Sequence, residues 1–129
     1  MYKSKFQFSN PTLDRVKFEL CEGFDDDNFE GISIECSTDI KIFGEQDAKV
    51  SLNVKIGSEN RNQPFDIDIV MSADFNWDNT VKEENVHKML KVNGSAVLLS
   101  YIRPIVSILT ASSKYSSFNI PFVDFTNSN

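Results

Sequence analysis

Four stretches of the chain alternate between apolar and polar residues, which is the period of strands with one buried and one solvated face. They cover residues 15–20, 32–42, 50–56 and 65–77. Short polar segments with turn-forming residues join the second strand to the third and the third to the fourth. This pattern predicts an antiparallel four-stranded sheet.

The segment between the first two strands is longer and of a different kind. Residues 21–31 read CEGFDDDNFEG, which is too long for a tight hairpin and predicts a crossover. Phe24 and Phe29 lie there among acidic residues. A calcium loop is not indicated, because the glycine and the closing glutamate of such a loop are not in their places.

After the strands, the pattern becomes helical. Thr80 and Glu83 match a capping box and predict a helix that begins near Val81. Asn93 and Gly94 are expected to end or break this helix. The predicted fold class is therefore α+β, with a four-stranded antiparallel sheet followed by a broken long helix.

The second part of this helix, from about residue 95 to 113, is apolar on nearly every face. Pro104 lies inside it and predicts a kink or a displaced start. A helix of this kind must be covered nearly all round, and one sheet covers only one side. We therefore expect a homo-oligomer, a dimer or a tetramer, that assembles through the helix. The residues expected at that interface share one helical face: Leu98, Ile102, Ile105 and Leu109.

Composition limits the class of protein. A length of 129 residues, with 25% charged and 40% hydrophobic residues, fits a single globular domain over residues 1–129. The net charge of −6 argues against nucleic acid, which requires a basic face. The N-terminus has no secretory signal pattern, and the most apolar stretch, residues 96–111, is too short and too polar for a membrane span. These features predict a cytoplasmic protein without membrane insertion.

Catalytic and metal-binding patterns are missing from the sequence. His87 is the only histidine and is expected on a helix surface without a nucleophile at a suitable spacing. Cys21 and Cys36 form no metal-ligand cluster, although one disulfide between them stays open at this point. Asp66 and Asp68 share the solvated face of a strand, where their pKa values should be near normal. We predict no enzyme, no metal and no cofactor.

Two segments carry a family resemblance. Residues 98–107 read LLSYIRPIVS, and residues 118–125 read FNIPFVDF. Together they resemble the helix and the following Asn- and Pro-containing run of the SecB family of protein-export chaperones. The order of four strands, crossover and helix is also similar, so that the resemblance covers residues 6–125, and its specific part covers residues 97–125.

The resemblance implies a chaperone that uses no ATP and binds unfolded or aggregation-prone polypeptides in hydrophobic grooves. It also implies subunits that assemble as dimers of dimers. Family members pass clients to the SecA motor or, as SecB-like proteins of toxin–antitoxin systems, stabilise an antitoxin. The acidic SecA-docking face is matched by Glu19 and Asp68, but Arg15 falls where an acidic residue is expected, and the sequence ends without the family's second helix and acidic tail. Weak or absent SecA binding is therefore expected.

The phenylalanines indicate where clients would bind. Three of the eleven, Phe18, Phe65 and Phe75, occupy inward strand positions and are expected in the core. Others lie in the crossover, beside the start of the second strand, or after the helix, where exposed apolar groups would suit a promiscuous groove. The residues predicted for client binding are Phe24, Phe29, Ile32, Ile34, Tyr115, Phe118, Ile120 and Phe122. An equally open reading is that Phe24 and Phe29 only attach the crossover to the rest of the fold.

A second hypothesis is a hotdog-like thioesterase or a small apolar-ligand carrier. Four strands and a long helix are compatible with it, and Glu83 or Glu84 could supply a carboxylate. In a hotdog fold, however, the helix comes early and later strands wrap around it. Activity on acyl-thioesters, compared with suppression of aggregation, distinguishes the two hypotheses.

Overall fold

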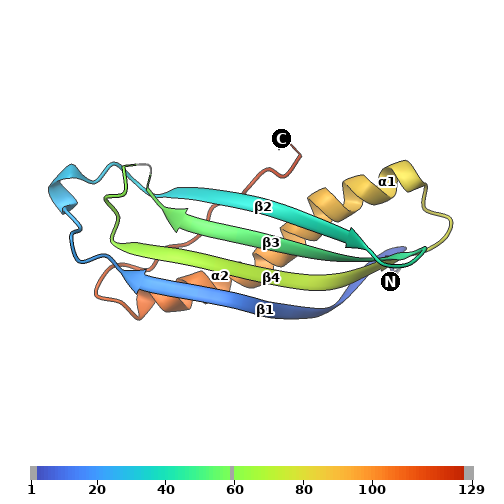
Figure 1. Cartoon of the computed structure of the whole chain (residues 1–129), viewed down its shortest axis with the longest axis horizontal. Helices are drawn as coiled ribbons and strands as arrows, with labels where there is room; N and C mark the ends of the chain where they lie inside the picture. The colour runs from blue at the N-terminus through green and yellow to red at the C-terminus, as the bar shows by residue number, and fades with distance from the viewer. Residues whose placement is uncertain (1–2, 59, 127–129) are drawn as a thin grey trace.

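A single antiparallel sheet forms the front layer of the molecule, and one long helix crosses behind it (Figure 1). The computed structural model describes residues 3–58 and 60–126, and within these residues the sheet has four strands. The strands are β1 (Phe6–Leu20), β2 (Ser33–Ile42), β3 (Asp47–Gly57) and β4 (Phe65–Trp77). Their spatial order, β1-β4-β3-β2, places β1 and β2 at opposite edges, so the crossover must carry the chain from one edge to the other.

The alternating pattern determines which side of the sheet is buried. The inward side chains of β3 and β4, including Leu52, Val54, Phe65 and Phe75, are almost inaccessible to solvent. They pack against the helix through Leu98, Leu99, Ile102 and Val106. The predicted sheet followed by a helix is confirmed, and because the helix follows all four strands, the hotdog arrangement is wrong.

Strand β1 is longer than the sequence pattern indicated. It begins at Phe6 rather than near Arg15 and pairs with β4 along its length. Its register shifts twice, between Ser9 and Thr12 and between Leu13 and Arg15. Each irregularity interrupts the two-residue period, which is why the first half of the strand has no continuous alternation to recognise.

The predicted break in the helix is also wrong. Helix α1 (Glu83–Lys88), the π-helical segment η2 (Met89–Gly94) and α2 (Ser95–Ala111) follow one another without interruption over 29 residues. Gly94 keeps helical backbone angles and lies buried against Phe75 and Val50. Asn93 and Gly94 therefore do not end the helix, and the chain forms a wider π-helical turn at this point instead.

Local signals at the start of the helix were misleading as well. The residue at the N-cap is Lys82, without a side-chain cap, and the expected capping box does not form. The Thr80 hydroxyl instead accepts a hydrogen bond from Lys5 Nζ at 3.0 Å. Pro104 does not displace the start of α2, which runs through it from Ser95.

By length and composition alone, the joined helix Glu83–Ala111 could cross a membrane. The sequence-based expectation rested on a shorter segment and missed this. Length and composition alone are weak evidence for a membrane span, because the core helix of a soluble protein has the same features. The packing of α2 against β3 and β4 explains why the helix is apolar.

Candidate functional site

An aromatic cluster joins two segments that are far apart in the sequence. The Phe24 ring packs edge-on against Phe29, with centroids 5.3 Å apart, and against Tyr115, with centroids 5.5 Å apart. All three side chains are half-buried, so each keeps part of its surface in solvent. The crossover and the segment after α2 thus lie side by side.

The β3–β4 loop holds the crossover in place. Asn62 accepts a hydrogen bond from the Asp25 backbone N–H at its Oδ1 and donates from Nδ2 to the Asp25 carbonyl, both at 2.8 Å. The Asp25 carboxylate accepts hydrogen bonds from the Asp27 N–H and from Asn28 Nδ2, and so caps the short 3₁₀ helix η1 (Asp26–Asn28). Phe24 is therefore attached to a fixed turn.

A row of polar side chains on α2 holds the segment after the helix. Arg103 donates hydrogen bonds to the carbonyl oxygens of Ile120 and Pro121, at 3.1 and 2.9 Å. One turn further, Ser107 donates to the side chain of Asn119. Because positions 103, 107 and 110 share one helical face, this contact continues to the next turn.

Thr110 completes this row from inside the protein. Its buried hydroxyl accepts a hydrogen bond from the Phe118 N–H at 2.8 Å and donates one to the Val106 carbonyl at the same distance. The Phe118 ring then packs towards the core, with its centroid 6.4 Å from that of Phe65. We call residues 118–125, held in this way, the post-helix strip.

The eight residues predicted for client binding differ widely in exposure. Ile32, Ile34 and Phe118 are half-buried like the aromatic cluster and pack against the core. Ile120 is only 5% exposed, so it supports the strip from below and is not accessible to a client. Phe122 is 96% exposed, with the Arg103 guanidinium 5.4 Å from the centre of its ring.

The structure also contains a cavity that the sequence analysis missed. It lies between the inner side of β2, the helix and the end of the strip, and measures about 440 Å³. Its lining residues are Cys36, Ser37, Thr38, Ile40, His87, Lys91 and Phe125. The sequence did contain two signals for this cavity. Cys36 and Ile40 lie on the same side of the strand as Ile34, and His87 and Lys91 are four residues apart and so share a helical face. Burial raises the pKa of the Cys36 thiol, which keeps it protonated at neutral pH.

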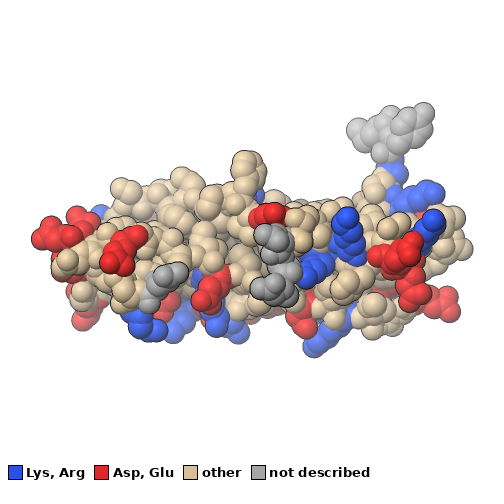
Figure 2. Space-filling model, turned by 90° about the horizontal axis from the view of Figure 1, so that it is seen from above, with Lys and Arg blue, Asp and Glu red and all other residues tan. Residues whose placement is uncertain are grey.

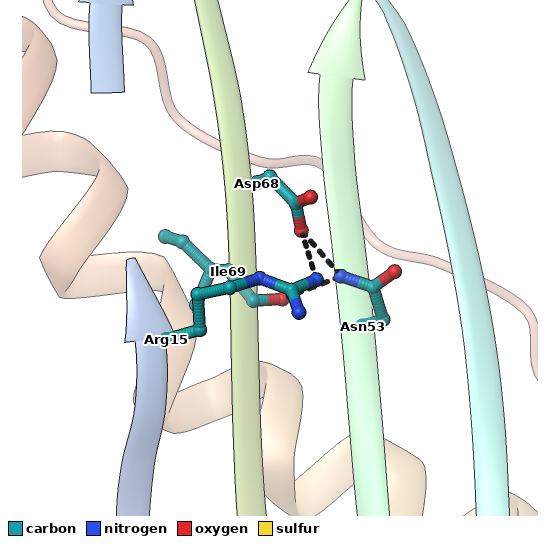
Figure 3. Close-up of polar contacts among 4 residues, drawn as sticks. All are labelled: Arg15, Asn53, Asp68 and Ile69. Carbon is teal, nitrogen blue, oxygen red and sulfur yellow. Dashed lines mark hydrogen bonds and ion pairs between the residues drawn. The ribbon is translucent and has the colours of Figure 1, made fainter. Parts of the chain in front are cut away.

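The outer face of the sheet contains the residues expected to dock SecA. Asp68 Oδ1 accepts hydrogen bonds from Arg15 at 3.0 Å and from Asn53 at 2.7 Å, and Asn53 also donates to the Ile69 carbonyl (Figure 3). Partial burial acts to raise the pKa of Asp68, but the hydrogen bonds from Asn53 and Arg15, and the charges of Arg15 and Lys55, outweigh it and lower the pKa. The expectation of a near-normal pKa for Asp68 is therefore wrong.

Charges on this face alternate in sign across the strands. Lys17, Asp68, Lys55 and Glu35 stand opposite one another along a single row of the sheet register. Glu19 is exposed and pairs in register with Asp66. The face thus has acidic and basic groups interleaved, rather than the acidic surface that the resemblance implied.

The four helix residues expected at a subunit interface do not share an environment. Leu98 and Ile102 are 0% exposed within the chain, so their side chains are not available to a partner. They are buried because this face of α2 packs against the sheet, whereas the sequence analysis expected it to contact a second subunit. Ile105 and Leu109 are half-buried.

Metal and thiol chemistry find no support in the described residues. No group of three or more His, Cys, Asp or Glu side chains among them could hold a metal ion. Cys21 and Cys36 are free thiols near opposite edges of the sheet, so the disulfide left open by the sequence does not form. His87, for which the sequence left a surface or a half-buried helical position open, is exposed.

Comparison with known proteins decides the family. The family model described as "Preprotein translocase subunit SecB" matches residues 18–128, which is most of the chain. This chain belongs to the SecB family. The resemblance noted in its helix and post-helix strip is thereby confirmed, and membership supports a chaperone function.

Solved structures agree with the SecB fold at low sequence identity. A SecB-like chaperone of Mycobacterium tuberculosis, solved with a peptide from an antitoxin, is 15% identical with a TM-score of 0.63, and the match covers 93% of this chain and 91% of that one. A Streptococcus agalactiae protein of unknown function is 11% identical with a TM-score of 0.51, covering 94% and 100%. No curated protein gives a significant sequence match.

Proposed function

We propose that this SecB family member is a holding chaperone that binds unfolded or aggregation-prone polypeptides without ATP. One observation carries the proposal: the crossover and the segment directly after α2 meet through Phe24, Phe29 and Tyr115 and leave apolar surface half-exposed. From there, Ile32 and Ile34 lead along β2 towards the cavity at Cys36 and Ile40. We call the surface formed by these residues the groove.

Physical chemistry explains how such a groove could hold many clients. Apolar contact has no direction, so it tolerates varied side chains, and each aromatic covered by a client contributes roughly 1–3 kcal/mol by area. Several such contacts along one polypeptide add up without sequence specificity. Holding requires no bond chemistry, nucleotide or cofactor, so we propose a non-enzymatic role in the cytoplasm for a single domain.

The same proposal includes the kind of client and the partner protein. An antitoxin is one candidate, because the Mycobacterium protein of this fold was solved with an antitoxin peptide. For SecA, we propose weak docking through Glu19 and Asp68, since Arg15 already pairs with Asp68 and basic residues interrupt the face. Tight SecA binding that is lost in Glu19→Lys or Asp68→Lys would contradict this.

Self-association is proposed through a different surface from the one first expected. Several large apolar side chains remain exposed on the helix-facing side of β1 and on the outer side of α2. They are Phe8, Leu13, Val16, Leu20, Tyr101 and Ile108. Phe8 and Tyr101 are in edge-on contact, with centroids 6.1 Å apart, so the two elements form one surface. A second copy that covers this surface would bury it from water.

The experiment is suppression of aggregation of a chemically unfolded client in the absence of ATP. Phe24→Ser combined with Phe122→Ser should reduce holding severalfold and leave the fold intact, because Phe122 is almost fully exposed and Phe24 is half-buried. Phe43→Ser is the matched control, since Phe43 is 61% exposed and lies directly after β2 at the end remote from the crossover. Equal holding by the double variant and the control would place the client elsewhere.

A further inference from the structure

The groove has different charges at its two ends. At the crossover end, five exposed acidic residues surround the aromatic cluster: Glu22, Asp25, Asp26, Asp27 and Glu30. Glu30 also lines a small cavity with Ile32, so acidic groups reach the apolar surface itself. Lys114 is the basic group in contact with the cluster, with its Nζ 5.4 Å from the centre of the Tyr115 ring. Negative charge therefore dominates this end.

The cavity end carries basic groups instead. Lys91 and His87 line the cavity, and Lys88 lies exposed between them on the same helix. Two acidic residues lie near these basic groups. Glu84 is exposed one helical turn before Lys88, and Asp124 precedes the lining residue Phe125, with its carboxylate accepting hydrogen bonds from the Thr126 N–H and hydroxyl. In the view from above, acidic groups gather at the crossover end, basic groups lie just beyond the middle, and acidic and basic groups are mixed at the far end of the molecule (Figure 2).

We infer that the groove selects extended segments with an apolar centre, basic residues at one end and acidic residues at the other, and that it binds them in one orientation. This inference rests on the proposed function. The basic end of the client would lie at the crossover and the acidic end at Lys88 and Lys91. Residues 32–40 of the groove floor span about 30 Å at strand spacing, so a client segment of about nine residues reaches from one end to the other.

At a surface of this kind, electrostatics affects which client segment is bound more than it affects the affinity. Each exposed charge pair contributes little by itself, but several pairs of the same sense add up, and reversed charges repel. The apolar surface would then provide affinity for any unfolded chain, and the charged ends would determine which segment of it is held and in which direction.

The test compares two synthetic peptides of about twelve residues, enough to span the groove, with the same composition. One has lysines at one end, glutamates at the other and an apolar centre, and the second has the same charges interleaved along its length. We expect the first to bind about tenfold more tightly at low ionic strength, and the difference to shrink as salt is raised, because exposed charges are screened.

Charge reversal provides the decisive variants. Asp26→Lys with Asp27→Lys should abolish the preference between peptides, whereas Asp14→Lys with Glu45→Lys, the same change on exposed residues elsewhere, should keep it. Adding Lys88→Glu and Lys91→Glu to the first pair, which leaves the crossover end about neutral, makes the cavity end the more acidic one and should restore the preference in the opposite orientation. A photo-crosslinker at the lysine end of the peptide should label residues 21–31 in the wild type and residues 87–91 in the inverted variant.

The outcomes separate this inference from the proposed function. Equal binding of the two peptides by a wild type that still suppresses aggregation would overturn the charge selection and leave the holding function standing. Labelling at both ends of the groove by one peptide would overturn the single orientation. If neither peptide binds and aggregation is not suppressed, both proposals are wrong.

Discussion

Asn62 is the residue that connects the β3–β4 loop to the crossover, through its two hydrogen bonds with the Asp25 backbone. Replacement by alanine removes both, and each such bond is worth about 1 kcal/mol net. We expect Asn62→Ala to keep the global fold, to increase hydrogen exchange in residues 21–31, and to weaken client holding. Asn85→Ala, an exposed asparagine on α1, is the control; equal exchange in the two variants would contradict the role of Asn62.

Asp68 links the protein's stability to pH. Its pKa is lowered from the ordinary value of 3.8 in the folded state, so the charged form stabilises the fold at any pH above that value. This contribution is lost as the pH falls through the lower, folded pKa. Unfolding measured by denaturant between neutral pH and strongly acidic pH should show a shallower loss of stability for Asp68→Asn than for the wild type, and identical slopes would contradict the assignment.

At the scale of elements, the post-helix strip depends on α2 through Thr110. Thr110→Val keeps the shape of the side chain but leaves the Phe118 N–H without its acceptor, which costs about 1–3 kcal/mol when the group stays buried. We expect this variant to be less stable and to expose the strip to protease, while Thr110→Ser retains the hydroxyl and behaves as the wild type. Equal sensitivity of the two variants would show that the strip is held by other contacts.

The elements differ in how well the sequence predicted them. Strands β2 and β4 were predicted nearly to their ends, and β3 to within three residues, because apolar and polar residues alternate along them with few exceptions. Half of β1 was missed because bulges around Asn10 and Asp14 shift the period. The helix break was wrong because Gly94 fits against Phe75 with normal helical angles, and this packing is a tertiary effect that local propensity does not contain.

The candidate site was predicted in part for the same reasons. Phe24, Phe29 and Tyr115 were named among the client-binding residues, and they pack together in the structure. The burial of Ile120, Leu98 and Ile102 was not foreseen, because a helix that is apolar all round does not indicate which face meets the sheet. The cavity at β2 was missed because its residues come from three segments that are far apart in the sequence.

For the whole molecule, the exposed apolar surface of β1 and α2 predicts self-association. Ile108 is 66% exposed on α2, so Ile108→Asp should leave the subunit folded but shift light scattering from an oligomer towards a monomer, because the charge would be buried at the contact. Ile42→Asp is the control, since Ile42 is 62% exposed at the end of β2. A wild type that is monomeric at high concentration would contradict the proposal.

The central claim is that unfolded polypeptide lies along the groove, and hydrogen exchange during client binding tests it most directly. The measurement compares the protein alone and saturated with a chemically unfolded client, without ATP. Slower exchange in residues 21–36 and 113–125, with the amides of β1 and β4 unchanged, is the predicted result. Slower exchange confined to β1 and β4, or no change anywhere while the client stays soluble, would contradict it.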